Sequence, residues 1–307
     1  MASFVQANSN GHLHDARIPS ISPLDRSFLY GDSIYEVVRT YDGSLFGYHE
    51  HFERLTRSAS SLGIVMPFDE SVLLTEIRRT VSAFRQEGDN KKEKNLYIRI
   101  QISRGAGEIG LDSKLADESF FVILVKALPS EDIAGKKKRG LALTVGKTLV
   151  RNHQRTLNPA WKTGNYLNNV LALKEARSKG KDDVIMNNLE GYLTEASTSN
   201  LFFVEDKKLI TPPLGQGILA GITRSVILEQ AAQAWDIAIT EENLTFSDLG
   251  RFEECFLTST TKDIVPVRSI DDITYRVGAR TLTSRLKKTF RQYVAEYIRR
   301  NPLLAVC

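Results

Sequence analysis

The stretch RTLNPAWKTGNYLNNVLALKEA, residues 155–176, places Lys162 where a loop gives way to a helix. Asn158-Pro159 upstream is a turn signal, and the apolar residues from Leu167 onward are spaced as in a helix. The neighbours of Lys162 are small or apolar, which favours partial burial. A partly buried lysine loses its charge more readily, and the neutral amine is a nucleophile toward aldehydes. The pattern indicates a Schiff-base lysine, and a surface lysine is the alternative.

The composition is that of an ordinary globular chain. Its 307 residues suffice for two domains, and 42% hydrophobic and 25% charged residues are typical of folded proteins in water. The net charge of +4 comes without a basic run interleaved with aromatic residues, so nucleic acid is not an expected partner. The polar N-terminus does not resemble a signal peptide, and no apolar run predicts a membrane span. Cys255 and Cys307 lie far apart, which predicts neither a disulfide nor a zinc site and favours the cytoplasm.

The order of elements predicts an α+β fold with two domains. Residues 1–128 are expected to form a small N-terminal domain, 129–138 a polar linker, and 139–307 a large C-terminal domain. In the first domain Asp42-Gly43 is a hairpin turn signal and Gly63 a helix stop. Helices are predicted at 49–63, 70–88, 221–235 and 277–300. Strands are predicted at 95–103, 119–128, 140–150, 182–188, 191–197, 200–206 and 208–213, the last four as two pairs.

Two motifs suggest functions that their surroundings disfavour. Gly105, Gly107 and Gly110 have the G-x-G-x-x-G spacing of a dinucleotide site. The residues LDSKLADE before the next strand are too few for the helix that such a site opens, so a flexible loop is expected instead. His49 and His51 lie two residues apart, but no cysteine or carboxylate cluster supports metal binding there, and no metal site is expected.

Three further segments carry groups suited to an anionic or aromatic ligand. Glu195 lies among small hydroxyl residues, where a carboxylate could pair with a protonated ring nitrogen; an exposed loop is the alternative. Ile222 and Thr223 belong to the first turn of a helix, whose free amides and dipole attract anions. Thr260 and Thr261 offer hydroxyls and amides after a short strand.

In their order along the chain, these motifs resemble the class IV aminotransferases, which are fold-type IV enzymes that use pyridoxal 5'-phosphate (PLP). The matching motifs are FERL at 52–55, KTGNYLNN at 162–169, GYLTEASTSNLF at 191–202, GITR at 221–224 and STTKDIVPV at 259–267. The resemblance extends from about residue 30 to about residue 270. It implies the two-domain fold of the D-amino acid aminotransferases, with the cofactor between the domains.

The resemblance also implies a role for each matching residue. Lys162 corresponds to the lysine that forms the Schiff base with the PLP aldehyde, Tyr166 to the tyrosine at the phenolic oxygen, and Glu195 to the glutamate at the pyridine nitrogen. The implied phosphate contacts are Arg54, Ile222, Thr223 and Thr260. The amides of Thr260 and Thr261 are implied to meet the substrate carboxylate.

The choice of substrate depends on two arginines. Tyr97 and Arg99 in YIRI resemble the Y-x-R stretch of branched-chain aminotransferases, in which the arginine meets the distal carboxylate of glutamate. Strand alternation puts both on one face, although Ile100 stands where that family usually has proline. Arg104 is the alternative carboxylate trap, as in the D-amino acid aminotransferases, which YEVVRTYDG at 35–43 also resembles.

The expected activity is transamination between a branched-chain L-amino acid and 2-oxoglutarate, in branched-chain amino acid biosynthesis. D-amino acid or (R)-amine transamination, the aminodeoxychorismate lyase reaction, and a PLP-fold protein that binds without turnover remain alternatives. The resemblance implies at least a homodimer, with the hairpin from Tyr30 to Phe46 directed toward the partner's pocket. Tyr30 and Tyr35 are therefore expected to contact substrate.

Overall fold

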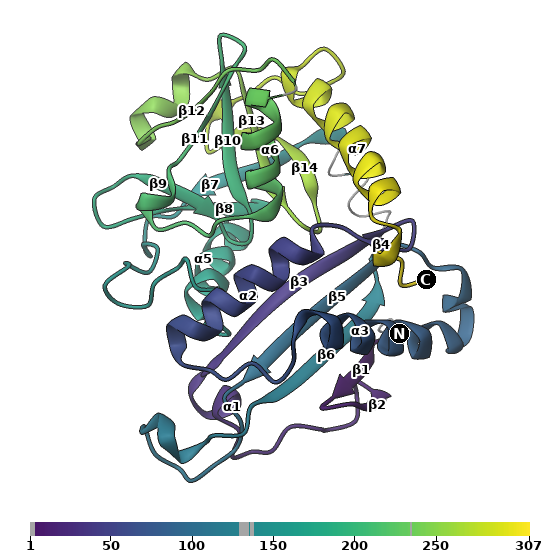
Figure 1. Cartoon of the computed structure of the whole chain (residues 1–307). Helices are drawn as coiled ribbons and strands as arrows, with labels where there is room; N and C mark the ends of the chain where they lie inside the picture. The colour runs from purple at the N-terminus through teal and green to yellow at the C-terminus, as the bar shows by residue number, and fades with distance from the viewer. Residues whose placement is uncertain (1–3, 129–134, 136–137, 234) are drawn as a thin grey trace. The chain divides into compact units, whose positions relative to one another are not determined.

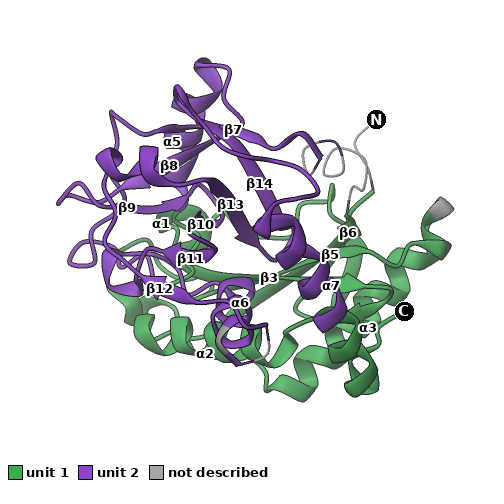
Figure 2. Cartoon of the chain, turned by 90° about the horizontal axis from the view of Figure 1, so that it is seen from above, with its two compact units in different colours: residues 1–128, 161–165, 294–307 green, residues 129–160, 166–293 purple. Residues whose placement is uncertain are grey.

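The computed structural model describes residues 4–128, 135, 138–233 and 235–307. The chain divides into two compact units, which Figure 2 shows in different colours. Unit 1 comprises Met1–Leu128, Trp161–Asn165 and Val294–Cys307, and unit 2 comprises Pro129–Ala160 and Tyr166–Tyr293. Most of the predicted linker at 129–138 lies outside the described residues, and the predicted domain boundaries stay predictions.

Unit 1 is built on a six-stranded antiparallel sheet in the order β2-β1-β6-β5-β3-β4 (Figure 1). Its strands are β1 Gln6–Ser9, β2 His12–Asp15, β3 Ser33–Tyr41, β4 Ser44–Leu45, β5 Leu96–Ser103 and β6 Phe120–Ala127. Its helices are α1 Arg26–Tyr30, α2 Tyr48–Leu62 and α3 Glu70–Gln86, with 3₁₀ turns at Gly88–Lys92, Ser113–Leu115 and Pro302–Leu304.

Two hairpins in unit 1 turn at dipeptides that tolerate left-handed backbone. Asp42 and Gly43 have φ of 48° and 87° between β3 and β4, which confirms the predicted turn. Asn10 and Gly11 have φ of 45° and 87° between β1 and β2. The second hairpin was not predicted from the sequence, although its Asn-Gly pair is the same kind of signal.

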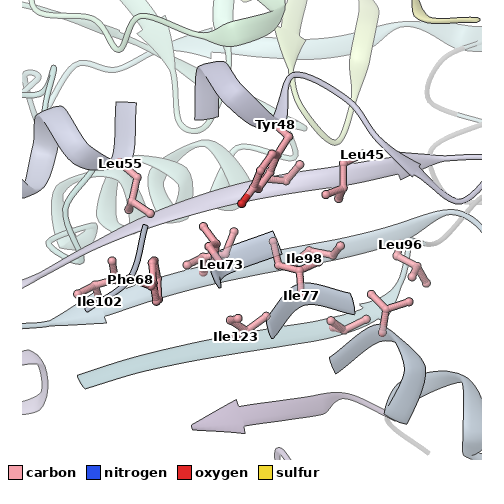
Figure 3. Close-up of a cluster of buried hydrophobic side chains, with 14 of the residues drawn as sticks. Leu45, Tyr48, Leu55, Phe68, Leu73, Ile77, Leu96, Ile98, Ile102 and Ile123 are labelled. Carbon is pink, nitrogen blue, oxygen red and sulfur yellow. The ribbon is translucent and has the colours of Figure 1, made fainter. Parts of the chain in front are cut away.

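The core of unit 1 lies between α2, α3 and one face of the sheet. Figure 3 shows side chains from both helices meeting alternate residues of β5 and β6, among them Leu73, Ile77, Ile98 and Ile123. Full burial of such side chains stabilises the fold by about 1.5–3 kcal/mol each. Because Leu96, Ile98 and Ile100 point into this core, the intervening Tyr97 and Arg99 share the opposite face, as predicted.

The glycine-rich loop between β5 and β6 is built by close backbone contacts. A Cβ atom at Gly105 would lie 2.0 Å from the carbonyl oxygen of Glu118, and one at Gly107 would lie 1.8 Å from that of Leu115. Arg26 ties down the same loop by donating to the carbonyl oxygen of Gly110 at 2.8 Å. The glycine spacing therefore serves the packing of this loop, and the structure confirms that no α-helix follows it before β6.

The segment with Lys162 runs beside the first residues of β3. Tyr35 N donates to the carbonyl oxygen of Lys162 at 2.9 Å, and Gly164 N donates to that of Ser33 at 2.8 Å. Asn165 Nδ2 donates to the carbonyl oxygen of Gly31 at 2.9 Å. These bonds fix the backbone of the lysine segment to unit 1. Helix α5 begins at Leu167, five residues after Lys162, with Tyr166 of unit 2 as its N-cap.

Unit 2 is built on a nine-stranded mixed sheet. The order is β12-β11-β10-β13-β14-β7-β8-β9, with β15 paired to β14. Both predicted strand pairs are confirmed as antiparallel neighbours, β8 with β9 and β10 with β11. The strands are β7 Leu141–Val145, β8 Asp183–Asn187, β9 Leu193–Ala196, β10 Asn200–Glu205, β11 Lys208–Thr211, β12 Ile239–Glu241, β13 Glu254–Ser259, β14 Asp263–Ile270 and β15 Ile273–Thr274. The two sheets confirm the predicted α+β class.

Helices α5 Leu167–Ser178 and α6 Ile222–Gln233 belong to unit 2, together with 3₁₀ turns at Leu214–Gln216 and Phe246–Arg251. Helix α7, Leu282–Arg300, lies within the helix predicted at 277–300 and buries Leu286, Phe290 and Val294. Across the described ranges, no helix has both the length and the apolar composition needed to cross a membrane.

Candidate active site

Lys162 lies beside the first residues of β3, and its side chain is next to an aromatic ring that an arginine also contacts. Its Nζ is 4.5 Å from the centroid of the Tyr35 ring. The Arg99 Cζ is 3.7 Å from the same centroid. Tyr35 is 6% exposed, so the ring is held in place while it contacts both cations. The structure thus brings together three residues that the sequence singled out: Lys162, Tyr35 and Arg99.

Arg54 belongs to a buried network on the core-facing side of β3, and it lies one helical turn before Ser58, whose Oγ accepts from Lys162 N at 3.3 Å. Its Nε and Nη2 donate to the two carboxylate oxygens of Glu36 at 2.6 and 2.8 Å. His51 Nδ1 lies 2.7 Å from Glu36 Oε2. All three side chains are at most 6% exposed. The bidentate geometry fixes the plane of the Arg54 guanidinium.

The charges in this network follow from its geometry. Burial alone would raise the pKa of Glu36, but the adjacent Arg54 and His51 hold it far below its usual range. An ionised Glu36 only accepts hydrogen bonds, so His51 Nδ1 carries the proton and donates. Burial lowers the pKa of His51, with smaller lowering contributions from the charges of Arg54 and Lys162. His51 is therefore a neutral hydrogen-bond donor at neutral pH.

We expect the free energy of unfolding to fall as the pH drops below 6.5, and His51→Asn to weaken that fall. The pKa of His51 is lower in the folded chain than its ordinary 6.5, so unfolding takes up a proton just below pH 6.5 and acid favours the unfolded state. Asparagine keeps an N–H donor toward Glu36 but does not titrate. Urea unfolding at several pH values between neutral and about 5 measures the difference.

His49→Asn is the matched control for this titration. The hydrogen bond with Glu70 raises the pKa of exposed His49, so its contribution to stability is lost as the pH rises through that value. Removing it should steepen the acid-dependent fall slightly, opposite to His51→Asn. The same pH dependence in wild type and His51→Asn would contradict the neutral, buried state of His51.

Arg104 is occupied by contacts within unit 1. Its Nε donates to Asp32 at 2.7 Å, its Nη1 to the carbonyl oxygen of Gly63 at 2.7 Å, and its Nη2 to that of Leu62 at 2.8 Å. All three guanidinium nitrogens therefore serve Asp32 and the end of helix α2. Arg99, by contrast, donates to Gln101 at 2.9 and 3.1 Å and pairs with no carboxylate of the described chain.

Tyr30 and Tyr97, the other tyrosines of unit 1 that were predicted to contact substrate, have different neighbours from Tyr35. Tyr30 ends α1, and its hydroxyl accepts from Gly110 N at 3.1 Å. Tyr97 has the Lys126 Nζ at 5.1 Å from its ring centroid. A cavity of about 250 Å³ on this face is bordered by Arg99, but neither tyrosine lines it; its walls include His14, Ser27, Gln101, Val122 and Leu124.

Glu195 in unit 2 is buried and held by three donors. Arg151 Nη2 donates to Oε1 at 2.6 Å, while Asn200 Nδ2 and Leu219 N donate to Oε2 at 3.1 and 3.3 Å. Arg151 also donates to Asn169 at 3.0 Å. The exposed-loop alternative for Glu195 is therefore wrong. Arg151, Asn169 and Asn200 were not predicted as site residues, because nothing in the local sequence indicates their partners.

The first turn of α6 lies beside the same polar group. Ile222 and Thr223 are buried there, as is Asn200. A Cβ atom at Gly221 would lie 2.0 Å from Asn200 Oδ1, so glycine is required for this close approach. The free amides at this helix start and the Thr223 hydroxyl form a feature suited to a phosphate group.

Thr260 and Thr261 lie in the tight connection between β13 and β14. The following residue, Lys262, anchors this connection, since its Nζ lies within 3.2 Å of Asp183, Thr198 and Ser199. Tyr166 is at the N-cap of α5. The predicted site residues are thus divided between the two units: Tyr30, Tyr35, Arg54, Tyr97, Arg99 and Lys162 in unit 1, and Tyr166, Glu195, Ile222, Thr223, Thr260 and Thr261 in unit 2.

Comparison with known proteins identifies the relatives of this chain. The family model for amino-transferase class IV matches residues 33–270. A Methanocaldococcus jannaschii protein with a provisional name as a branched-chain-amino-acid aminotransferase is 34% identical over 92% of this chain and 94% of its own length. D-alanine aminotransferase of Listeria monocytogenes is 30% identical over 95% of both chains. The branched-chain aminotransferase of Thermoproteus uzoniensis, solved with norvaline, superposes with a TM-score of 0.85 at 28% identity, covering 96% of this chain and 97% of that one.

Proposed function

Because the chain belongs to the class IV aminotransferases, which use PLP, we propose that it transfers the amino group of a branched-chain L-amino acid to 2-oxoglutarate. The family membership makes the chain a PLP-dependent aminotransferase. The preference for a branched-chain donor is the proposal. The relatives divide between branched-chain and D-alanine enzymes, so the argument must come from residues of this chain.

The contrast between Arg99 and Arg104 carries the proposal. A distal carboxylate on glutamate or 2-oxoglutarate needs a cation that no acid of the protein already neutralises. Arg99 meets this condition among the described residues, and it shares the Tyr35 ring with Lys162. Arg104 is already paired with Asp32. The alternative in which Arg104 binds the substrate carboxylate, as in the D-amino acid aminotransferases, is therefore disfavoured.

The unit 1 residues suit the covalent and proton-transfer tasks. When bound, PLP supplies the sink for electrons released at the substrate Cα. Lys162 Nζ, which lies against the Tyr35 ring, is the proposed amine for the cofactor aldehyde. Lys162 would also be the base that moves the proton at the substrate Cα. Arg54, whose plane is fixed by Glu36, is the proposed cation for the phosphate.

The unit 2 residues fit the remaining parts of PLP. A buried carboxylate that accepts several N–H groups, as Glu195 does, suits a protonated ring nitrogen. The start of α6 offers amides and a hydroxyl to phosphate oxygens. The proposed contacts in this unit are Tyr166 at the phenolic oxygen, Glu195 at the ring nitrogen, Ile222, Thr223 and Thr260 at the phosphate, and Thr260 and Thr261 at the substrate carboxylate.

We expect Arg99→Ala to slow the half-reaction with glutamate by about one to two decades and to change the half-reaction with leucine far less. The loss corresponds to one charge-assisted hydrogen bond, about 1.5–3 kcal/mol. Leucine has no distal carboxylate and does not use it. Single-turnover rates with each donor measure the effect. Equal losses for both donors would refute this role of Arg99.

Arg104→Ala is the matched variant. It should lower stability, because Asp32 and the end of α2 lose their donor, and should leave the ranking of donors intact. A panel of L-leucine, D-leucine, D-alanine and (R)-1-phenylethylamine with 2-oxoglutarate completes the test. Faster turnover of a D-enantiomer or of the amine would replace the proposal with that activity, and no turnover of any donor would favour a binding protein.

We further propose a homodimer, in which the hairpin from Tyr30 to Phe46 is directed toward the partner's pocket. Tyr30 and Tyr35 are then candidate substrate contacts. The exposed Phe28, Ile109 and Leu111 support an interface near this hairpin, since such large apolar side chains are usually covered in an assembly. Sedimentation should give twice the mass of one chain, and a fully active monomer would contradict the proposal.

A further inference from the structure

Arg151 forms a buried ion pair whose presence is not explained by stability. The Arg151 and Glu195 side chains are each 7% exposed, with 2.6 Å between Nη2 and Oε1. Burying two charges costs several kcal/mol of desolvation, and a well-packed apolar pair is often as stable. In addition, the buried Nε of Arg151 has no acceptor among the described residues. A pair with this cost calls for a functional reason.

The surroundings of the pair favour one ionisation state of Glu195. Arg151, Asn200 and the amide of Leu219 all direct N–H groups at its two oxygens. Each of these contacts strengthens when the carboxylate is ionised and weakens when it takes up a proton. Arg151 contributes the only formal charge among these three donors, so of the three it has the largest effect on the proton affinity of Glu195.

The positive charge of Arg151 affects where a proton resides between Glu195 and the pyridine nitrogen of PLP. Resting on the proposed function, in which Glu195 faces the pyridine nitrogen, one proton lies between a carboxylate oxygen and a ring nitrogen. It resides on whichever atom has the greater proton affinity. A positive charge 2.6 Å from the carboxylate lowers the affinity of the oxygen. Without that charge, a buried carboxylate becomes a stronger base and draws the proton to itself.

We propose that Arg151 is a positioning residue that keeps this shared proton on the ring nitrogen by holding Glu195 ionised and fixed. Asn169 supports the arrangement by accepting from Arg151 Nη1 at 3.0 Å while its own amide donates to the carbonyl oxygen of Ser197 at 2.7 Å. The guanidinium is thereby set by the first turns of α5, independently of the ligand. A ring nitrogen that keeps its proton is the better electron acceptor, so the effect reaches the rate of the reaction.

The experiment is ¹⁵N NMR of the holoenzyme reconstituted with PLP labelled at the pyridine nitrogen, whose shift separates the protonated from the neutral ring. We expect a protonated ring in wild type and in Arg151→Lys, and a neutral ring in Arg151→Met at neutral pH. The kcat of Arg151→Met should fall by about one to two decades, the rate equivalent of one charge-assisted hydrogen bond, with little change in KM. If Arg151→Met does not fold, Arg151→Gln takes its place with the same expectation.

Two controls separate the possible failures. Arg251→Met removes an arginine of unit 2 that pairs with Glu242, away from the Glu195 group, and should leave the ¹⁵N shift unchanged. Glu195→Gln tests the proposed function itself, and an unchanged shift in that variant would show that Glu195 does not face the ring nitrogen. A changed shift in Glu195→Gln with a protonated ring in Arg151→Met would overturn the role of Arg151. Thermal unfolding of the apo-chain measures the purely structural loss.

Discussion

Replacement of Lys162 by alanine is expected to abolish transamination and to remove the near-visible absorbance of the holoenzyme. The variant lacks the amine that we propose binds the cofactor aldehyde and acts as the base at the substrate Cα. Loss of the proton transfer alone lowers kcat by about 10²–10⁴-fold. The Lys162 backbone accepts from Tyr35 N and the Nζ lies over the Tyr35 ring, so the position of this amine is specific to Lys162. Absorbance spectra and single-turnover assays with leucine measure both effects.

Lys92→Ala is the control for this prediction. Lys92 is an exposed lysine of unit 1, and its loss should leave absorbance and turnover as in wild type. Unchanged thermal unfolding of apo Lys162→Ala would show that the loss of activity is chemical. Turnover by the purified Lys162→Ala enzyme at the wild-type rate would sink the assignment of Lys162.

Replacement of Glu36 by alanine is expected to lower the free energy of unfolding by about 3–5 kcal/mol, the usual cost of leaving one member of a buried ion pair unpaired. The side chain is 1% exposed and accepts from Arg54 and His51. Its removal takes away the carboxylate that the buried Arg54 guanidinium and the His51 Nδ1–H both contact. Urea unfolding of the apo-chain at neutral pH measures the change.

Glu53→Ala is the matched control for Glu36→Ala. Glu53 lies on the same helix as Arg54 but is half exposed, with Arg57 and His49 as partners, so its loss should change stability by less than about 0.5 kcal/mol. Glu36→Gln keeps a hydrogen-bond acceptor but not the charge, so its loss of unfolding free energy should lie between those of Glu36→Ala and Glu53→Ala. Equal midpoints for Glu36→Ala and Glu53→Ala would mean that the buried network contributes nothing to folding.

Local patterns in the sequence predicted most elements of this fold. The Asp42-Gly43 turn, the end of α2 at Gly63 and the buried stripe of α7 each depend on residues within one or two turns of chain. The β1–β2 hairpin was missed because its strands are four residues long and carry little apolar alternation. Its stability comes from pairing with β6, more than 100 residues away, which no local pattern encodes.

The sequence indicates the motifs of the candidate site but not the residues that support them. Lys162 and Glu195 lie in recognisable segments, whereas Arg151 lies in a loop with no periodicity or motif. Glu36 did leave a signal, since it occupies the core-facing register of β3 between Ile34 and Val38. A carboxylate in an apolar register implies a buried cation nearby. The sequence cannot say which cation, because that depends on how α2 packs on the strand.

The pairing of the lysine segment with β3 has a consequence for which changes of length the chain tolerates. Successive residues of β3 serve opposite faces: Tyr35 contacts Lys162 and Arg99, while Glu36 fixes Arg54. One residue inserted between Ser33 and Glu36 would exchange the faces of the residues that follow and shift the lysine relative to its ring. A point substitution in this strand changes one side chain, whereas an insertion or deletion changes the facing of every strand residue that follows it. We expect inserted or deleted residues to be tolerated instead in exposed turns such as Leu189–Glu190, which lie outside the paired strands.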